Sequence, residues 1–389
     1  TDTDTDSDTD SDTDSGTGDP PARWTVLVYM NADNTLEVAA PFDWAEILAA
    51  GHSEQVHVVA LVDTMSGGGE VRHVTADGHE IVSVTAHDWS EPDMGDWQTL
   101  RDFAVWAAGR YPAERLALVM WDHGDGWRGP AVPDDGPVKG ISQDCGGDGS
   151  CAGASIISIA AGDWAAALSS LTAALGRDLD LVGFDACLMA MWEVAAGTAP
   201  YAGHLVASAD NEPAAGWDYT GFLQALYADP DMDAAALGTA VADAYEASSA
   251  EAYTMSVTDL SAVADLTAAV DALADALRAE PGLYNDVETA RLAATAYAGL
   301  DTYRDLGELA AAVRDLGGLA ESADALTTQL AAAVVYNRVK PAYDGTGGLA
   351  IYAPGQDGEF LEEYVASGAV WSADTGWDEF LQELVASGN

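Results

Sequence analysis

Residues 178–195, "DLDLVGFDACLMAMWEVA", are the most informative segment of the sequence. An apolar run leads directly into Asp185-Ala186-Cys187, and a helical pattern follows. Such a run predicts a buried strand that gives way to a helix. A thiol that only fills the core would contribute little more than an alanine at this point. A nucleophile, in contrast, would be well placed there, and Cys187 is therefore a candidate for chemistry.

The same alternation of strand and helix extends on both sides of this stretch. Apolar, β-branched runs predict further strands, a hairpin is predicted around Asp77-Gly78, and two segments have helical spacing. Strands alternating with helices indicate an α/β fold with a mostly parallel open sheet that helices flank on both faces. The predicted strands are 24–30, 56–63, 115–124 and 204–210, the hairpin is 70–84, and the helices are 99–112 and 161–176.

The chain divides by composition into three regions. Residues 1–21 contain an Asp/Thr/Ser repeat with almost no apolar side chains, which predicts a disordered tether. Residues 22–225 carry the strand and helix alternation and form the predicted α/β core. Residues 226–389 are alanine-rich and helical, and we expect this region to return one strand, residues 348–353, to the main sheet.

The charge of the chain restricts its partners. The formal net charge is −51, from 65 acidic and 14 basic residues. Nucleic acid and anionic membrane surfaces are therefore poor partners, and no nucleic-acid partner is expected, whereas a basic peptide would be attracted. Solubility in high salt is the simpler explanation of a surface so acidic and so poor in lysine. No apolar run approaches the ~20 residues that span a bilayer, so no transmembrane segment is expected.

The three cysteines have different predicted roles. Cys145 and Cys151 lie in the glycine-rich stretch "QDCGGDGSCAG", which a disulfide could close in an exported protein. Metal binding by the same pair is the weaker alternative, because a second pair of ligands is missing. Cys187 would then be the free thiol, and no metal site is predicted.

A histidine follows another predicted strand. The run "LVMWDHGDGW" places His123 and Gly124 just beyond its end. Ligands of open α/β sheets bind outside the carboxyl ends of the strands, so His123 and Cys187 share one edge if their strands are neighbours. The imidazole could then activate the thiol, and the Gly124 and Cys187 amides could face an oxyanion. A surface histidine and a core cysteine are the ordinary alternatives, which this joint placement disfavours.

Five blocks of the sequence resemble clostripain-like cysteine peptidases, and they occur in that family's order across residues 23–386. The family is similar in fold to caspases, gingipains and legumains, with a His/Cys dyad on a parallel-rich sheet. The blocks are "WTVLVYMNADNTLE", "LVMWDHGDGW", "GFDACLMAMWEVA", "NEPAAGWDY" and "DTGWDEFL".

The resemblance implies roles for individual residues. His123 matches the catalytic histidine, Cys187 the nucleophile, and Asp185 the aspartate at the floor of the S1 pocket, which selects arginine or lysine at P1. A carboxylate two residues from the nucleophile suits a guanidinium. We expect Asp210 or Glu212 in "SADNEPAAGWDY" to line the same pocket.

The sequence departs from the family pattern in two places. Asp125 stands where a glycine is more usual, and the Cys145–Cys151 loop occupies a region that family members often cleave during activation. Lys139 in "DDGPVKGISQD" is the predicted processing site, with Arg128 as the other candidate. Some family members depend on calcium, but no calcium motif stands out here, so we expect no required cofactor and keep Ca²⁺ as an option.

Together these observations predict an exported cysteine endopeptidase, secreted or tethered to the cell surface, for instance as a lipoprotein. Its substrates would be polypeptides with a basic P1 residue, cleaved through an acyl-enzyme. A surface binding protein on a peptidase fold that has lost its activity is the alternative. The presence of both His123 and Cys187 argues against that alternative.

Overall fold

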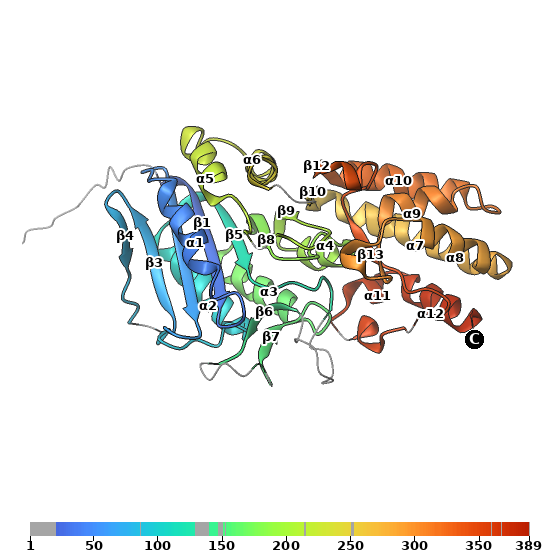
Figure 1. Cartoon of the computed structure of the whole chain (residues 1–389), viewed down its shortest axis with the longest axis horizontal. Coiled ribbons are helices and arrows are strands. Elements are labelled where there is room, and N and C mark those ends of the chain that lie inside the picture. The colour runs from blue at the N-terminus through green and yellow to red at the C-terminus, as the bar shows by residue number, and fades with distance from the viewer. Residues whose placement is uncertain are drawn as a thin grey trace, which may run out of the picture.

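In the computed structural model of the chain, the main element is a nine-stranded sheet (Figure 1). The strands follow the order β12-β10-β9-β8-β5-β1-β2-β3-β4 across it. The structure describes residues 21–85, 87–128, 140–146, 151, 153–213, 215–249, 253–358, 360–366 and 368–388. The strands of this sheet are β1 (Ala22–Ala32), β2 (Val56–Thr64), β3 (Glu70–Thr75), β4 (Gly78–Ile81), β5 (Ala113–Trp121), β8 (Leu179–Asp185), β9 (Ala202–Ala207), β10 (Thr254–Asp259) and β12 (Val334–Val339).

Two small sheets and a set of helices complete the described part of the chain. The small sheets pair β6 (Ile141–Asp144) with β7 (Ser155–Ile157) and β11 (Tyr303–Asp305) with β13 (Ala350–Tyr352). The helices are α1 (Ala40–Ala49), α2 (Trp97–Arg110), α3 (Asp163–Leu175), α4 (Trp192–Thr198), α5 (Tyr219–Ala228), α6 (Ala234–Ser248), α7 (Val263–Ala279), α8 (Tyr284–Ala293), α9 (Leu306–Val313), α10 (Ala320–Ala333), α11 (Val370–Asp374) and α12 (Trp377–Ser387).

The centre of the main sheet is parallel and its two sides are antiparallel. Strands β2, β1, β5, β8 and β9 run in the same direction, whereas β3 and β4 on one side and β10 and β12 on the other are antiparallel to their neighbours. This arrangement confirms the predicted α/β fold class. It also shows that β5 and β8, which precede His123 and Cys187, are neighbours.

Both faces of the sheet are covered, as the alternation of side chains along β1 illustrates. Leu27 and Tyr29 belong to one buried cluster, and Val26 and Val28 belong to the other. Helices α1, α5 and α6 contribute side chains to the second cluster, while α2, α3 and α4 contribute to the first. Because strand side chains alternate between the faces, each parallel strand needs apolar residues at nearly every position, which explains the continuous apolar runs.

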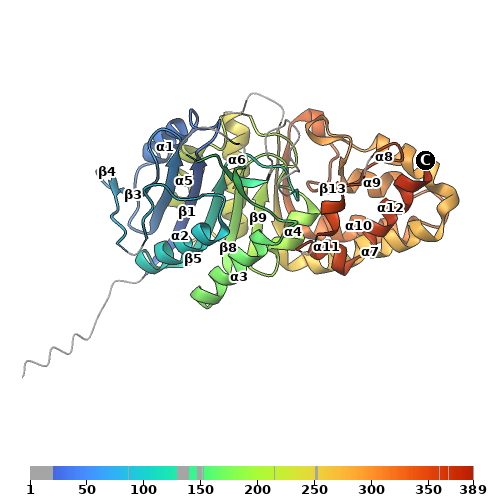
Figure 2. The same cartoon turned by 90° about the horizontal axis from the view of Figure 1, so that it is seen from below.

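The C-terminal helices form a layer beyond α4, and Figures 1 and 2 show α7 to α12 gathered at the opposite end from β3 and β4. The prediction that residues 348–353 return to the main sheet is wrong. β13 instead pairs with β11, and a single bridge joins Ala350 to Met191. The position beside β9 is taken by β10, and β12 covers the outer side of β10.

This topology also corrects the predicted domain boundary at residues 225 and 226, because β10 and β12 of the main sheet come from the C-terminal region. The predicted tether lies almost entirely outside the described residues, which begin at residue 21. No helix within the described part of the chain combines the length and the apolar composition that a membrane span requires.

Aspartate side chains begin several of the helices. The carboxylates of Asp96, Asp218, Asp233 and Asp305 accept backbone N–H groups at the N-terminal ends of α2, α5, α6 and α9. An aspartate at this position satisfies a donor that the helix leaves unpaired, and its negative charge suits the positive end of the helix dipole. Part of the acidic composition therefore has a structural use.

Candidate active site

The carboxyl ends of β5 and β8 bring His123 and Cys187 to one cavity. The parallel register pairs Trp121 with Asp185, and the Asp122 N–H donates to the Asp185 carbonyl oxygen over 3.3 Å. The two loops that leave these strands therefore start side by side. The cavity is lined by Leu36, Ala39, Asp43, Trp121, Asp122, His123, Asp185, Ala186, Cys187, Glu212, Pro213 and Gly216.

The nucleophile candidate Cys187 lies in a tight turn after β8. Leu188, the next residue, has a φ of 66°, a conformation that is unfavourable for a side chain and is held by its N–H bond to the Asp210 carbonyl (3.1 Å). The Cys187 Sγ accepts the Glu212 N–H at 3.3 Å. Burial raises the pKa of the Cys187 thiol, and the nearby Asp185 carboxylate adds to this effect. The thiol therefore needs a base to become a nucleophile at neutral pH.

The histidine is positioned by the loop that follows β1. The His123 Nε2 lies 2.8 Å from the Thr35 Oγ1. The preceding residue, Asp122, is buried and accepts the His123 N–H (2.6 Å), the Asn34 Nδ2 (2.7 Å) and the Gln143 N–H (2.6 Å). Burial raises the pKa of Asp122 well above its usual range, and these donated bonds oppose that shift. Asp122 thus fixes the backbone from which the imidazole projects.

Gly124 lies against the turn that carries the nucleophile. A Cβ atom at position 124 would be 2.3 Å from the Cys187 carbonyl oxygen, so only glycine fits there. The neighbouring Asp125 is buried. Its Oδ2 lies 3.6 Å from the Arg128 guanidinium, which offsets the additional negative charge.

Three carboxyl groups converge at the side of the cavity that adjoins Cys187. Asp185 accepts the Tyr219 hydroxyl (2.9 Å) and the Trp217 N–H (3.2 Å). Asp43 of α1 accepts the Trp121 indole N–H at 2.6 Å, and Glu212 stands beside Asp185. Hydrogen bonds thus fix Asp185 and Asp43, and all three residues line the cavity.

Burial dominates the electrostatics of this cluster. It raises the pKa of Asp185 to about 6, although bonds from neighbouring groups partly oppose the shift. Burial, reinforced by the Asp185 carboxylate, raises the pKa of Asp43 to about 8 and that of Glu212 well above its usual range. Burial disfavours the charged form of each carboxyl, and at Asp43 and Glu212 the charge of Asp185 adds repulsion.

Asp210 does not have the position that the sequence predicts. Asp210 is not among the described residues that line the cavity. Its Oδ1 accepts the Ala298 N–H (2.7 Å), and its Oδ2 accepts the Tyr343 hydroxyl. Asp210 therefore holds a C-terminal segment and does not line the predicted S1 pocket.

A disulfide joins Cys145 to Cys151, and Cys187 is the free cysteine. The candidate processing residue Lys139 lies outside the described residues. The other candidate, Arg128, lies near Glu363 as well as Asp125 and is about one-quarter exposed.

Sequence reasoning missed Asp43, although the sequence carries a signal for it. In "APFDWAEILA" the buried positions are Ala40, Asp43, Trp44 and Ile47, which is the spacing of one helix face. A carboxylate within an otherwise apolar face is costly to bury without a partner. Such a residue is therefore a candidate for a role in a site.

A histidine and a thiol on adjacent strand ends of a mostly parallel sheet define the class of cysteine peptidases with a caspase-like fold. Comparison with known proteins specifies the family. The model described as the clostripain family matches residues 28–383. The chain therefore belongs to the clostripain family of cysteine peptidases. Among curated proteins, none matches this sequence.

Solved structures with a similar fold have low sequence identity to the chain. A secreted C11 cysteine protease from Bacteroides thetaiotaomicron, in complex with an irreversible peptide inhibitor, has a TM-score of 0.70 at 20% identity, covering 92% of this chain and 99% of that one. An inactive zymogen C11 protease from Parabacteroides distasonis has a TM-score of 0.63 at 19% identity, covering 93% and 99%. A further structure of a secreted Bacteroides thetaiotaomicron C11 protease, "iotapain", has a TM-score of 0.66 at 16% identity, covering 93% and 99%.

Proposed function

We propose that this peptidase is an endopeptidase that cleaves polypeptides after arginine, and less often after lysine. The observation that carries the proposal is the group of three carboxyls, Asp185, Glu212 and Asp43, in the cavity beside Cys187. No lysine or arginine is among the described residues that line this cavity. A P1 guanidinium would supply the positive charge that these buried carboxyls lack, and its planar donors suit carboxylate oxygens.

The proposed reaction uses His123 as acid and base and Cys187 as nucleophile. His123 accepts the thiol proton, and the Cys187 sulfur attacks the scissile carbonyl carbon. The Gly124 and Cys187 amides donate to the oxyanion. When the C–N bond breaks, His123 gives its proton to the leaving amine. Water then attacks the thioester with His123 as base, which releases the carboxylic acid and restores the thiol.

An arginyl chloromethyl ketone tests this proposal directly. The reagent should alkylate the wild-type protein once, at Cys187, and leave Cys187→Ala unlabelled. An alanyl chloromethyl ketone is the matched control, and it should react much more slowly because it lacks the P1 cation. A folded protein whose Cys187 ignores the arginyl reagent would favour the binding-protein alternative. Equal labelling by both reagents would contradict the basic P1 preference.

The raised pKa values of the pocket predict that arginine preference increases with pH. Below about pH 6 the carboxyls of Asp185 and Asp43 are mostly protonated, so the pocket offers little charge to a P1 cation. As pH rises toward 8 they ionise, more readily when the cation is bound, and binding strengthens. The ratio of kcat/KM for matched Arg and Ala P1 peptides should rise on the order of tenfold between pH 6 and 8.

This ratio separates the effect of the pocket from that of the dyad, because His123 and Cys187 act on both substrates in the same way. Asp43→Asn should weaken the rise near pH 8, where Asp43 titrates. A ratio that stays flat from pH 6 to 8 in the wild type would mean that these carboxyls do not contact the P1 side chain.

We further propose that the chain is cleaved after Lys139 by its own activity. Arg128 is the less suitable site, because its side chain lies between Asp125 and Glu363. Intact-mass analysis should show two fragments meeting at residues 139 and 140 in the wild type and one full-length chain in Cys187→Ala. The Cys145–Cys151 disulfide lies within the second fragment, so the fragments separate without reduction. A whole chain with full activity would contradict self-processing, and Lys139→Gln is the control for the position of the cut.

The acidic N-terminal segment suggests the location of the enzyme. We propose that residues 1–21 form a tether that holds the peptidase away from a cell surface after export. The support is their composition of aspartate, threonine and serine together with the Cys145–Cys151 disulfide, since disulfides persist in oxidising compartments.

A further inference from the structure

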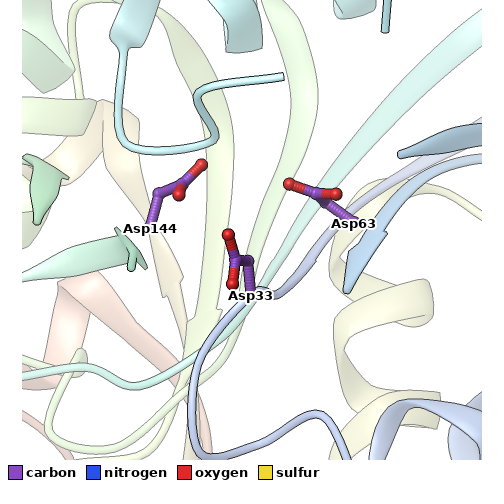
Figure 3. A group of neighbouring side chains, drawn as sticks. All are labelled: Asp33, Asp63 and Asp144. Atoms are coloured by element: carbon purple, nitrogen blue, oxygen red, sulfur yellow. The ribbon is translucent and has the colours of Figure 1, made fainter. Parts of the chain in front are cut away.

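A second group of carboxylates lies at the same edge of the sheet, apart from the cavity. Asp33, Asp63 and Asp144 each offer an oxygen, and these oxygens all lie within 4.8 Å of one another. Figure 3 shows the three carboxylates, with one oxygen of each turned toward a common space. None of the three is among the described residues that line the cavity beside Cys187.

The fold brings these residues together from distant parts of the chain. Asn31 pairs with Asp63 in the parallel register of β1 and β2, so Asp33, two residues further on, lies close to Asp63. Asp144 ends β6, and the next residue, Cys145, donates its N–H to the Asp33 carbonyl oxygen over 2.9 Å. Two strand ends and a separate small sheet thus converge at one point.

Two of the oxygens lack the partners that a buried carboxylate needs. Asp33 and Asp63 are each only 1% exposed, and the Asp33 Oδ1 and the Asp63 Oδ2 have no hydrogen-bond donor. Asp144 differs, because it accepts the Met94 N–H (2.5 Å) and the Gly146 N–H (2.8 Å). A buried carboxylate oxygen without a donor is costly, and three adjacent carboxylates repel one another as well.

Nearby acidic residues increase the electrostatic repulsion in this cluster. Besides their effects on each other, the cluster members experience the negative charges of Glu91 and Glu37. Burial and the neighbouring carboxylates raise the pKa of Asp33 to about 6 and that of Asp63 to about 8. Protons shared among the carboxyls are one way to relieve the repulsion, and a bound cation is the other. These two explanations can be distinguished, because only a cation site predicts that added metal changes the properties of the protein.

We propose that Asp33, Asp63 and Asp144 bind one Ca²⁺ ion. Ca²⁺ takes oxygen ligands at about 2.3–2.6 Å, so two oxygens on one ion lie at most about 5 Å apart, and the three carboxylates satisfy this limit. Mg²⁺ is usually held by one or two carboxylates and keeps several waters, whereas three converging carboxylates suit Ca²⁺. Water completes the coordination.

The position of the site connects it to the histidine, a consequence that rests on the proposed function. Asp33 precedes Asn34 and Thr35, whose side chains contact Asp122 and His123. Asp144 follows Gln143, whose N–H donates to Asp122. A Ca²⁺ ion would therefore join the two segments that hold the imidazole in place.

The test measures metal binding in a protein that cannot cleave itself. In the Cys187→Ala full-length chain, titration calorimetry with CaCl₂ at constant ionic strength should show one site, and saturating Ca²⁺ should raise Tm by a few degrees. Asp63→Asn, which keeps the Oδ1 that accepts the Thr64 N–H, should weaken Ca²⁺ binding at least tenfold. Asp77→Asn removes the same charge from an exposed turn and is the matched control.

The metal-free proteins add a second measurement. In EDTA, Asp63→Asn should melt at the same temperature as the parent or above it, because the substitution relieves repulsion among the carboxylates. Equal Ca²⁺ affinity and equal Tm rise in Asp63→Asn and Asp77→Asn would overturn the site, as would the lack of any Ca²⁺ effect on the parent. Binding of Mg²⁺ as tight as that of Ca²⁺ would overturn the choice of metal. None of these measurements depends on peptidase activity. Failure of the Ca²⁺ proposal can therefore be distinguished from failure of the proposed reaction.

Discussion

Replacement of Cys187 by alanine is expected to abolish peptide hydrolysis and leave the fold intact. The substitution removes the sulfur that would form the acyl-enzyme and changes the side-chain volume very little. Loss of the nucleophile in enzymes of this kind lowers kcat by about 10⁴-fold or more. The measurement is kcat/KM on an arginyl peptide, together with Tm and circular dichroism of the purified variant.

His123→Ala should also lose most activity, because the thiol has a raised pKa and needs a base. The two losses should not add in the double variant, since residues that act as one unit fail together. Cleavage of arginyl peptides by Cys187→Ala at the wild-type rate would refute the mechanism. Thr35→Val offers a graded control, because it removes only the hydroxyl next to the His123 Nε2.

The main features of the core could be predicted because they depend on local patterns. Continuous apolar runs identify buried parallel strands, and the polar residue after each run marks the edge where ligands bind. His123 and Cys187 follow such runs directly. Their meeting also requires β5 and β8 to be neighbours, which the topology rules for α/β sheets favour and the structure confirms.

The errors concern contacts between residues far apart in the sequence. The direction of the Asp210 side chain depends on Ala298 and Tyr343, which no local pattern connects to it. The strands β10 and β12 carry polar residues at the side of the sheet, so they lack the apolar run of a central strand. The run at 347–355 has that pattern, yet it is buried among the C-terminal helices and pairs with β11.

The carboxylates around the two sites also divide into those that a local sequence pattern reveals and those that only the fold brings together. Asp43 interrupts an apolar helix face, and that interruption can be read from the sequence alone. Asp33, Asp63 and Asp144 each follow or end a strand, but their convergence depends on the register of β1 with β2 and on the position of β6. In a chain with 65 acidic residues, only the fold distinguishes a carboxylate that meets two others from one that faces solvent.

Asp185→Asn is expected to remove most of the preference for arginine while leaving the reaction itself possible. Asp185 is buried beneath the cavity, and an asparagine keeps the shape of the side chain and can still accept the Trp217 N–H. The P1 guanidinium would then lose its principal charge partner in a buried space. Loss of one member of a buried ion pair costs roughly 3–5 kcal/mol, which corresponds to a loss of roughly 10²-fold to several thousand-fold.

The measurement that isolates this effect is kcat/KM for matched peptides with Arg, Lys and Ala at P1. In Asp185→Asn the Arg/Ala ratio should fall by about two orders of magnitude or more, with the Ala peptide nearly unaffected. Asp43→Asn is the matched control, because Asp43 lines the same cavity but also accepts the Trp121 indole N–H, so its loss should lower the ratio less. An unchanged ratio in Asp185→Asn would transfer the role to Glu212, the remaining predicted carboxyl in the cavity. An equal fall for the Arg and Ala peptides would instead mean that Asp185 supports the turn that carries Cys187 and does not select the substrate.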